Sequence, residues 1–187
     1  MKAYKLTNAK DQTRKETKWG PNVTHETNGE GGLCGPGWLH YYDNPLLAVM
    51  LDPIHGNFGA TAHLWEAEAE GEIKEDDGRK FGCTKLTTIR QIPLLEVTKE
   101  QRIAFAILCA KETCDHPKWN EWADKWLSGE DRSGEAAANA ASVATCTAYV
   151  AAYAAATATA TYAVYATTHS YISVNLHEIV KEAMKYE

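Results

Sequence analysis

The residues best suited to chemistry lie close together between Trp38 and Asn44. This segment holds an imidazole, an indole, two phenols and an amide, groups that donate or accept hydrogen bonds and whose rings stack on a flat ligand. We predict that it lines a ligand pocket in which His40 or Tyr42 contacts the ligand. Packing of the same side chains in a core is the alternative. The predicted binding residues are Trp38, His40, Tyr41, Tyr42 and Asn44.

The other reactive side chains do not form a motif typical of catalysis or metal binding. Histidine and cysteine are scattered through the first half without the spacing of a zinc site; they are Cys34, His40, His55, His63 and Cys83. The run from Cys114 to His116 places cysteine, aspartate and histidine side by side, but sequence neighbours seldom face one another. The glycine-rich stretch 31–37 lacks both the Walker lysine and the dinucleotide fingerprint. We therefore predict no catalytic residue, no metal and no cofactor.

Three tryptophans are predicted to lie on one face of a helix. Trp119, Trp122 and Trp126 are separated by three and four residues, the spacing of a single helical face. Such a stripe usually packs into a core. Because aromatic side chains are also favoured anchors in interfaces, a surface that binds a partner protein is the alternative.

An alanine-rich segment from about 134 to 169 is predicted to form one long helix. Alanine is the best helix former, and a helix of this length extends roughly 50 Å; a strand over 157–161, where Thr and Ala alternate, is the alternative. From Ala136 to Leu176 there is no Asp, Glu, Lys or Arg, so a lone helix in water would be marginal. Either the chain's own helices or a second copy must cover it, and we predict a second copy because the other predicted helices are much shorter. The tyrosines that would fill gaps in this homo-oligomer are Tyr149, Tyr153, Tyr162 and Tyr165.

Charge and composition exclude several classes of protein. The net charge is −6, which argues against direct nucleic-acid binding, because neutralising phosphates requires a basic face. The basic N-terminal residues are not followed by an apolar run, so no signal peptide is predicted. The uncharged segment consists mainly of Ala and Thr, which contribute little to membrane insertion. We predict no membrane span, and an odd number of cysteines, 5, favours the reducing cytoplasm.

The order of the predicted elements indicates an α+β fold. Short strands over 3–7, 38–42, 63–70 and 84–92 predict a small mixed sheet in the N-terminal half. Asn44 and Pro45 mark a helix start, and Thr98 with Gln101 forms a capping box that opens the helical half. Ser133 and Asn175 cap two later helices. We predict an α+β domain at 1–97 and a helical region at 98–187.

Several short motifs resemble a family of uncharacterised small proteins of bacteriophages and prophages. They are an N-terminal Ala-Tyr-Lys strand, Gly-x-x-His at 37–40, Asn-Pro-x-x-Ala at 44–48 and the strand Lys85 to Arg90. The ending from Trp119 to Ser133, followed by alanine-rich sequence, is also similar. The resemblance implies a phage-type accessory protein in the bacterial cytoplasm that binds and inhibits a host factor, including CRISPR or another defence system. A structural phage protein held together by the alanine-rich helix is an alternative.

The same strand and helix start also resemble ADP-ribosyltransferase-like folds. There an aromatic residue at the end of a strand lies beside the nicotinamide pocket, a place that Tyr41 or Tyr42 would take. The sequence departs from that pattern, because Tyr4 and Lys5 stand where the group carries His or Arg. Glu96 is the only candidate for a catalytic glutamate by its order in the chain. This resemblance implies a transferase-like enzyme or a nucleotide-binding protein as the alternative function.

Overall fold

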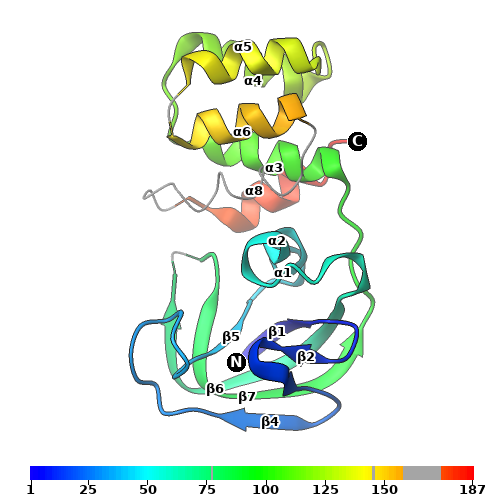
Figure 1. The fold of residues 1–187 in the computed structure, drawn as a ribbon, viewed down its shortest axis with the longest axis vertical. Helices are drawn as coiled ribbons and strands as arrows, with labels where there is room; N and C mark the ends of the chain where they lie inside the picture. The colour runs from blue at the N-terminus through cyan, green and yellow to red at the C-terminus, as the bar shows by residue number, and fades with distance from the viewer. Residues whose placement is uncertain (77, 145, 158–173) are drawn as a thin grey trace. The chain divides into compact units, whose positions relative to one another are not determined.

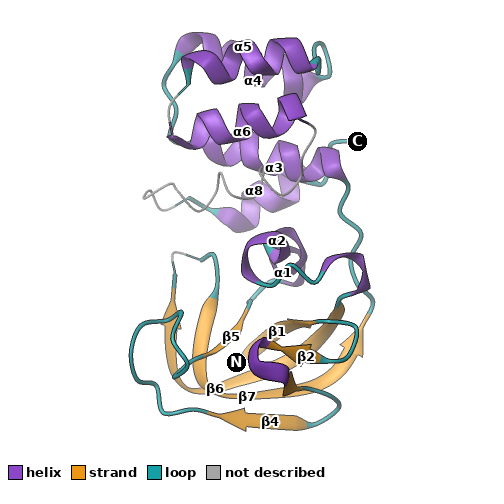
Figure 2. Ribbon diagram, in the orientation of Figure 1, coloured by secondary structure: helices purple, strands orange, loops and turns teal. Residues whose placement is uncertain are grey.

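The computed structural model describes residues 1–76, 78–144, 146–157 and 174–187, and within them the chain forms two compact units. The units are Met1–Glu96 and Val97–Glu187, a boundary one residue from the predicted one. The first holds every described strand and the second only helices (Figures 1 and 2). The predicted α+β class is therefore confirmed.

The first unit is an antiparallel sheet with two short helices. Its main strands are β1 (Lys2–Thr7), β4 (Val23–Glu26), β5 (Leu39–Tyr41), β6 (His63–Glu75) and β7 (Phe81–Ile92). A two-stranded ribbon joins β2 (Gln12–Thr13) to β3 (Thr17–Lys18), and the helices are α1 (Pro45–Met50) and α2 (Asp52–His55). The main order is β1-β6-β7-β4, with β5 also on β7. Every pairing of the described strands is antiparallel, which is more uniform than the mixed sheet predicted.

The sheet closes on itself through one bridge between Tyr4 and Tyr42. The amide of each residue donates to the carbonyl of the other, at 2.7 and 2.9 Å. Because β5 already pairs with β7, this bridge completes a ring of strands from β1 through β6, β7 and β5 back to β1. The inside of the ring is a core made of Ala3, Trp19, Tyr41, Ala67, Ala69, Cys83 and Leu86.

Buried and exposed side chains alternate along β6. Trp65, Ala67 and Ala69 are buried, whereas Glu68 and Glu70 are exposed. Leu64 is also fully buried although it lies on the opposite face from Trp65. The reason is that this end of β6 is covered on both faces: Leu64 pairs with Leu6 of β1, and α1 packs against β1.

The second unit is a set of helices with clear capping signals. They are α3 (Lys99–Lys111), α4 (Pro117–Ser128), α5 (Gly134–Val143), α6 (Cys146–Thr157) and α8 (Leu176–Ala183). The predicted capping box of Thr98 and Gln101 is present at α3. The hydroxyl of Ser133 accepts from the amide of Ala136, and the side chain of Asn175 accepts from Glu178. These helix starts are confirmed.

The predicted continuous alanine-rich helix is wrong for the described part of the segment. The backbone at Ala144 is extended, with φ −93° and ψ 157°, and it separates α5 from α6, which pack on each other. A helical hairpin lets the chain bury its own alanine faces, which a straight helix would leave to a partner. The buried alanines include Ala137, Ala140 and Ala141 of α5 and Ala148, Ala151, Ala152 and Ala155 of α6. The rest of the segment, with Tyr162 and Tyr165, lies outside the described residues.

Within the described residues, no helix combines the length and the apolar character needed to cross a membrane.

Candidate functional site

The predicted ligand-binding segment forms β5 and the start of α1, and strand geometry separates its residues. Tyr41 points into the ring of strands, is fully buried and donates from its hydroxyl to the sulfur of Met1 at 3.7 Å. His40 and Tyr42 belong to the opposite face, because side chains alternate along a strand. The structure therefore separates Tyr41 from the other two predicted contact residues.

Tyr42 forms a buried pair with His55, a residue that the sequence did not single out for this site. The hydroxyl of Tyr42 lies 2.7 Å from Nδ1 of His55, and the two rings stack with centroids 5.8 Å apart and 25° between planes. Burial raises the pKa of Tyr42 above its ordinary value, with the charge of Asp52 as a further cause. Burial lowers the pKa of His55 to about 4, and Lys80 adds to that effect.

Because of these shifts both side chains are neutral at neutral pH. In the tautomer in which the hydroxyl of Tyr42 donates to Nδ1 of His55, the imidazole carries its own proton on Nε2. None of the described residues accepts a hydrogen bond from that Nε2. A histidine with such a low pKa is a weak base, so the pair is suited to hold a ligand by a hydrogen bond and poorly suited to proton transfer.

His40 lies near this pair and has a separate hydrogen-bond partner. Its Nε2 donates to the carbonyl of Leu33, which leaves Nδ1 as the acceptor of a neutral ring. Burial lowers the pKa of His40, and the positive charges of Lys5 and Lys80 lower it further. Lys80 in turn donates to Sγ of exposed Cys34 at 3.2 Å. The site therefore presents a histidine donor, a histidine acceptor and one ammonium group.

The remaining predicted binding residues have structural roles. Trp38 is buried, donates from Nε1 to the carbonyl of Gly31 at 3.3 Å and carries the amine of Lys74 over its ring. The side chain of Asn44 caps α1, accepting from the amides of Leu46 and Leu47 at 2.8 and 3.2 Å. Both residues shape the loop and the helix around the site, and their polar groups are already occupied.

The sequence pattern missed two site residues, His55 and Lys80. His55 reaches Tyr42 because the chain turns back through α1 and α2, and the carboxylate of buried Asp52 fixes that turn by accepting from the amides of Phe58 and Gly59. The run from Asp52 to Pro53 signals a helix start, but no spacing in the sequence indicates that His55 would meet Tyr42. Glu96, the candidate by order for a transferase, lies in the exposed segment after β7.

The predicted tryptophan stripe of α4 lies in the core of the second unit. Trp119, Trp122 and Trp126 are all buried. Nε1 of Trp119 donates to the carbonyl of Ala148 at 2.9 Å, and Arg132 lies over the ring of Trp126 at 4.7 Å. The sequence left two interpretations open, a core and a partner surface. In the structure these three side chains pack in a core.

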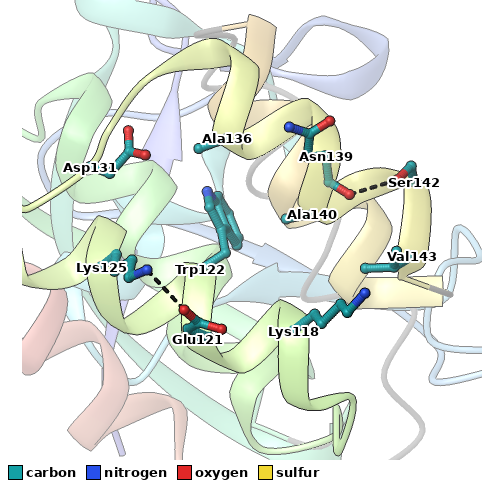
Figure 3. Close-up of a pocket in the computed structure, with 10 residues that line it drawn as sticks. All are labelled: Lys118, Glu121, Trp122, Lys125, Asp131, Ala136, Asn139, Ala140, Ser142 and Val143. Atoms are coloured by element: carbon teal, nitrogen blue, oxygen red, sulfur yellow. Dashed lines mark hydrogen bonds and ion pairs between the residues drawn. The ribbon is translucent and has the colours of Figure 1, made fainter.

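A groove of about 370 Å³ lies between α4 and α5 (Figure 3). Four residues on one face of α4 line it: Lys118, Glu121, Trp122 and Lys125. Small or short side chains of α5 form much of the opposite wall, among them Ala136, Asn139, Ala140 and Val143. Nε1 of Trp122 is buried and has no hydrogen-bond partner among the described residues. No pattern in the sequence indicated this groove.

Two of the predicted interface tyrosines are exposed side by side on α6. Tyr149 and Tyr153 have 46% and 38% of their surfaces exposed, and their rings stack with centroids 5.9 Å apart. Four alanines of the same helix are buried within the chain: Ala148, Ala151, Ala152 and Ala155. We name this surface the α6 tyrosine pair.

Comparison with known proteins identifies one family match. A family model described as "Domain of unknown function (DUF7666)" matches residues 1–100, which include the whole first unit. No curated protein and no solved structure matches the chain. The groove and the α6 tyrosine pair lie beyond the matched residues.

Proposed function

The chain belongs to the family with a domain of unknown function DUF7666, and for this member we propose a phage-type accessory protein that binds and inhibits a host factor without catalysis. The proposal assigns contact with the host protein to the α6 tyrosine pair. The observation that carries it is the exposure of two stacked aromatic rings on a helix whose Ala148, Ala151, Ala152 and Ala155 are buried.

The chemistry of this surface supports a protein partner. Tyrosine brings a large contact area and a polar hydroxyl with little loss of rotamer entropy, which is why it is enriched among residues that dominate binding energy. The net charge of −6 disfavours a nucleic-acid partner. The pair also lies outside the family-matched residues, where a feature particular to this protein, such as its choice of partner, would be expected.

The test uses the full chain and a double variant, Tyr149→Ala with Tyr153→Ala. Alanine keeps the helix propensity of α6, so the change removes the rings and leaves the helix. A bacterial protein is captured with the wild-type chain and purified, and its affinity and activity are then measured with each variant. We expect at least about tenfold weaker binding and a matching loss of inhibition for the double variant.

Ile89→Ala is the matched control, because Ile89 is 42% exposed and lies on β7 of the first unit. It should bind and inhibit like the wild-type chain. Equal binding by the double variant would contradict the assignment to α6. ADP-ribosylated products in a lysate supplied with NAD, lost on Glu96→Gln, would replace the binding proposal with the transferase alternative.

A second candidate function is the binding of a small nucleotide at the Tyr42–His55 pair. The observation that favours it is Nε2 of His55, a donor to which no described residue offers an acceptor, beside the ammonium of Lys80. We expect His55→Gln to abolish nucleotide binding measured by calorimetry. Unchanged binding in that variant would exclude this pair as the site.

A further inference from the structure

We infer that the groove between α4 and α5 binds a small, elongated carboxylate that carries a neutral hydrogen-bond acceptor at its opposite end. This inference concerns the second unit alone and does not depend on the proposed function. It starts from an indole donor that the fold leaves without a partner.

Trp122 supplies the first contact. The side chain is 6% exposed, and its Nε1 is buried without a hydrogen-bond partner among the described residues. Buried donors are nearly always paired, so an unpaired one on a side chain that lines a groove requires an explanation, and we assign that role to an acceptor brought by a ligand. Figure 3 shows the indole ring standing in the middle of the groove, with its nitrogen toward Ala136 and Asp131.

The charges around the groove determine which end binds the carboxylate of the ligand. Asp131 stands at the indole end, so a second negative charge there would be repelled and the acceptor must be neutral (Figure 3). Lys125 is already paired with Glu121 at 2.8 Å. Lys118 extends toward Val143 at the other end, and no described carboxylate forms an ion pair with it. A carboxylate on the ligand would supply that partner.

The walls of the groove determine the body of the ligand. Ala136, Ala140 and Val143 lie one helical turn apart on the α5 side, and their short side chains leave room beside the Trp122 ring. Lys118 and Trp122 are one turn apart on α4, about 6 Å along the axis. A flat apolar body between the two polar ends fits this arrangement, and the groove volume of about 370 Å³ is within the range of small-molecule sites.

The direct test follows the indole signal of Trp122 by NMR in the ¹⁵N-labelled full chain. The sequence has 6 tryptophans, and Trp122→Phe identifies which indole signal belongs to Trp122. The probe is 4-acetamidobenzoate, which has a neutral carbonyl and a carboxylate on opposite sides of one ring. We expect this signal alone to move, with a Kd of about 1 mM or lower. A signal that stays fixed at about tenfold higher probe concentration overturns the site.

Two matched comparisons test the chemical class. The neutral probe 4-acetamidobenzamide should bind about fivefold more weakly than the acid, and Lys118→Gln should remove that difference. Equal binding of acid and amide by the wild-type chain overturns the assignment of a carboxylate. Benzoate, which lacks the second acceptor, should leave the Trp122 indole signal in place, and a full shift with benzoate overturns the role of the neutral acceptor.

Trp119→Phe is the control for the indole substitution, because Nε1 of Trp119 already donates to Ala148 within the same unit. That variant should melt at a lower temperature, since it leaves a buried carbonyl without its donor. Trp122→Phe should lose probe binding while its melting temperature is unchanged or higher. An equal fall in melting temperature for both variants would show that the Trp122 donor has a partner inside the protein, and would overturn the inference.

Discussion

Lys5 is an amine held inside the ring of strands, and no carboxylate of the described residues pairs with it. Its Nζ donates to the carbonyl of His40 at 2.5 Å and lies 4.9 Å from the centre of the Trp19 ring. Burial lowers the pKa of Lys5 to about 8 from 10.5. The charged amine therefore costs stability at neutral pH, and its hydrogen bond and its contact with the indole offset part of that cost.

The pH dependence of this cost gives the first prediction, for Lys5→Met. Below pH 8 the lysine is charged in both the folded and the unfolded chain, so the cost is fully present. Between pH 8 and 10.5 only the unfolded chain binds the proton, so the free energy of unfolding of the wild-type chain rises with pH, by up to about 3 kcal/mol. The stability of Lys5→Met relative to wild type should fall by a similar amount over this interval.

Urea melts at several pH values measure this difference, with Lys10→Met as the control because Lys10 is exposed on the same part of the chain. The control should show no such trend. A wild-type chain that gains no stability relative to Lys5→Met from pH 8 to 10.5 would refute the buried charge.

The Tyr42–His55 pair gives the second prediction, on acid stability. The lowered pKa of His55, about 4, means that the unfolded chain binds a proton between pH 6.5 and 4 while the folded chain does not. The contribution of neutral His55 to the free energy of unfolding is therefore complete above pH 6.5 and is lost as the pH falls toward 4. His55→Gln should flatten the dependence of unfolding free energy on pH within this window, by up to about 3 kcal/mol.

Tyr42→Phe tests the hydrogen bond of the pair separately. It keeps the stacked ring and removes the donor to buried Nδ1, which should cost about 1–2 kcal/mol at pH 7. Tyr149→Phe is the control, because Tyr149 is exposed on α6, and it should unfold like the wild-type chain. Replacement of Tyr42 by alanine is less informative, since this residue also closes the sheet through its bridge to Tyr4.

At the scale of elements, the helical hairpin of α5 and α6 changes what a charge at Ala152 would do. In a long helix shared by two copies, glutamate there would separate the copies. In the structure Ala152 is fully buried inside its own chain. We predict that Ala152→Glu unfolds the second unit at much lower urea concentration, because a buried unpaired carboxylate is costly. Circular dichroism measures the loss of helix.

Ser142→Glu is the matched control on the exposed face of α5, next to buried Ala141. It should leave the urea midpoint nearly unchanged. If Ala152→Glu kept the full helical signal and changed only the mass of the particle in solution, the alanines would face a second copy and not the chain's own helices.

Elements that depend on contacts within a short stretch of sequence could be predicted. Elements that depend on contacts between distant residues could not. Asn44 and Thr98 begin helices because their side chains satisfy amides two or three residues away, an interaction contained within a short sequence window. The break at Ala144 has no such signal, since alanine favours helix and burial against a neighbouring helix decides where the chain turns. The pairing of Tyr42 with His55 depends on the path through α1 and α2 and could not be read from spacing.

At the scale of the whole molecule, self-association through the alanine-rich segment remains a prediction. The argument from an uncovered long helix no longer applies to α5 and α6, which pack on each other and bury seven of their alanines within the chain. The α6 tyrosine pair holds the exposed large side chains of this segment within the described residues. Self-association through this pair would occupy the surface that we assign to the host protein, so the two predictions exclude each other.

Light scattering on the purified chain tests this prediction against the host-binding proposal. A homo-oligomer should have a mass at least about twice the 20.6 kDa of one chain, reduced toward one chain by the double tyrosine-to-alanine variant. A wild-type mass of one chain at micromolar concentration would reject self-association and leave the tyrosine pair available to a host protein.

The closing bridge of the first unit has a consequence for the order of events during synthesis. β1 pairs with β6, so Lys2 cannot form its strand pairing until Glu68 has been synthesised, and Thr7 cannot until His63 has been. β5 must likewise wait for β7, which ends at Ile92. β1 and β5 therefore leave the ribosome before the strands they pair with, and each remains without that sheet partner until β6 or β7 has followed. A nascent chain stalled before β7 would expose unpaired strand edges, the state that chaperones recognise and that aggregates most readily.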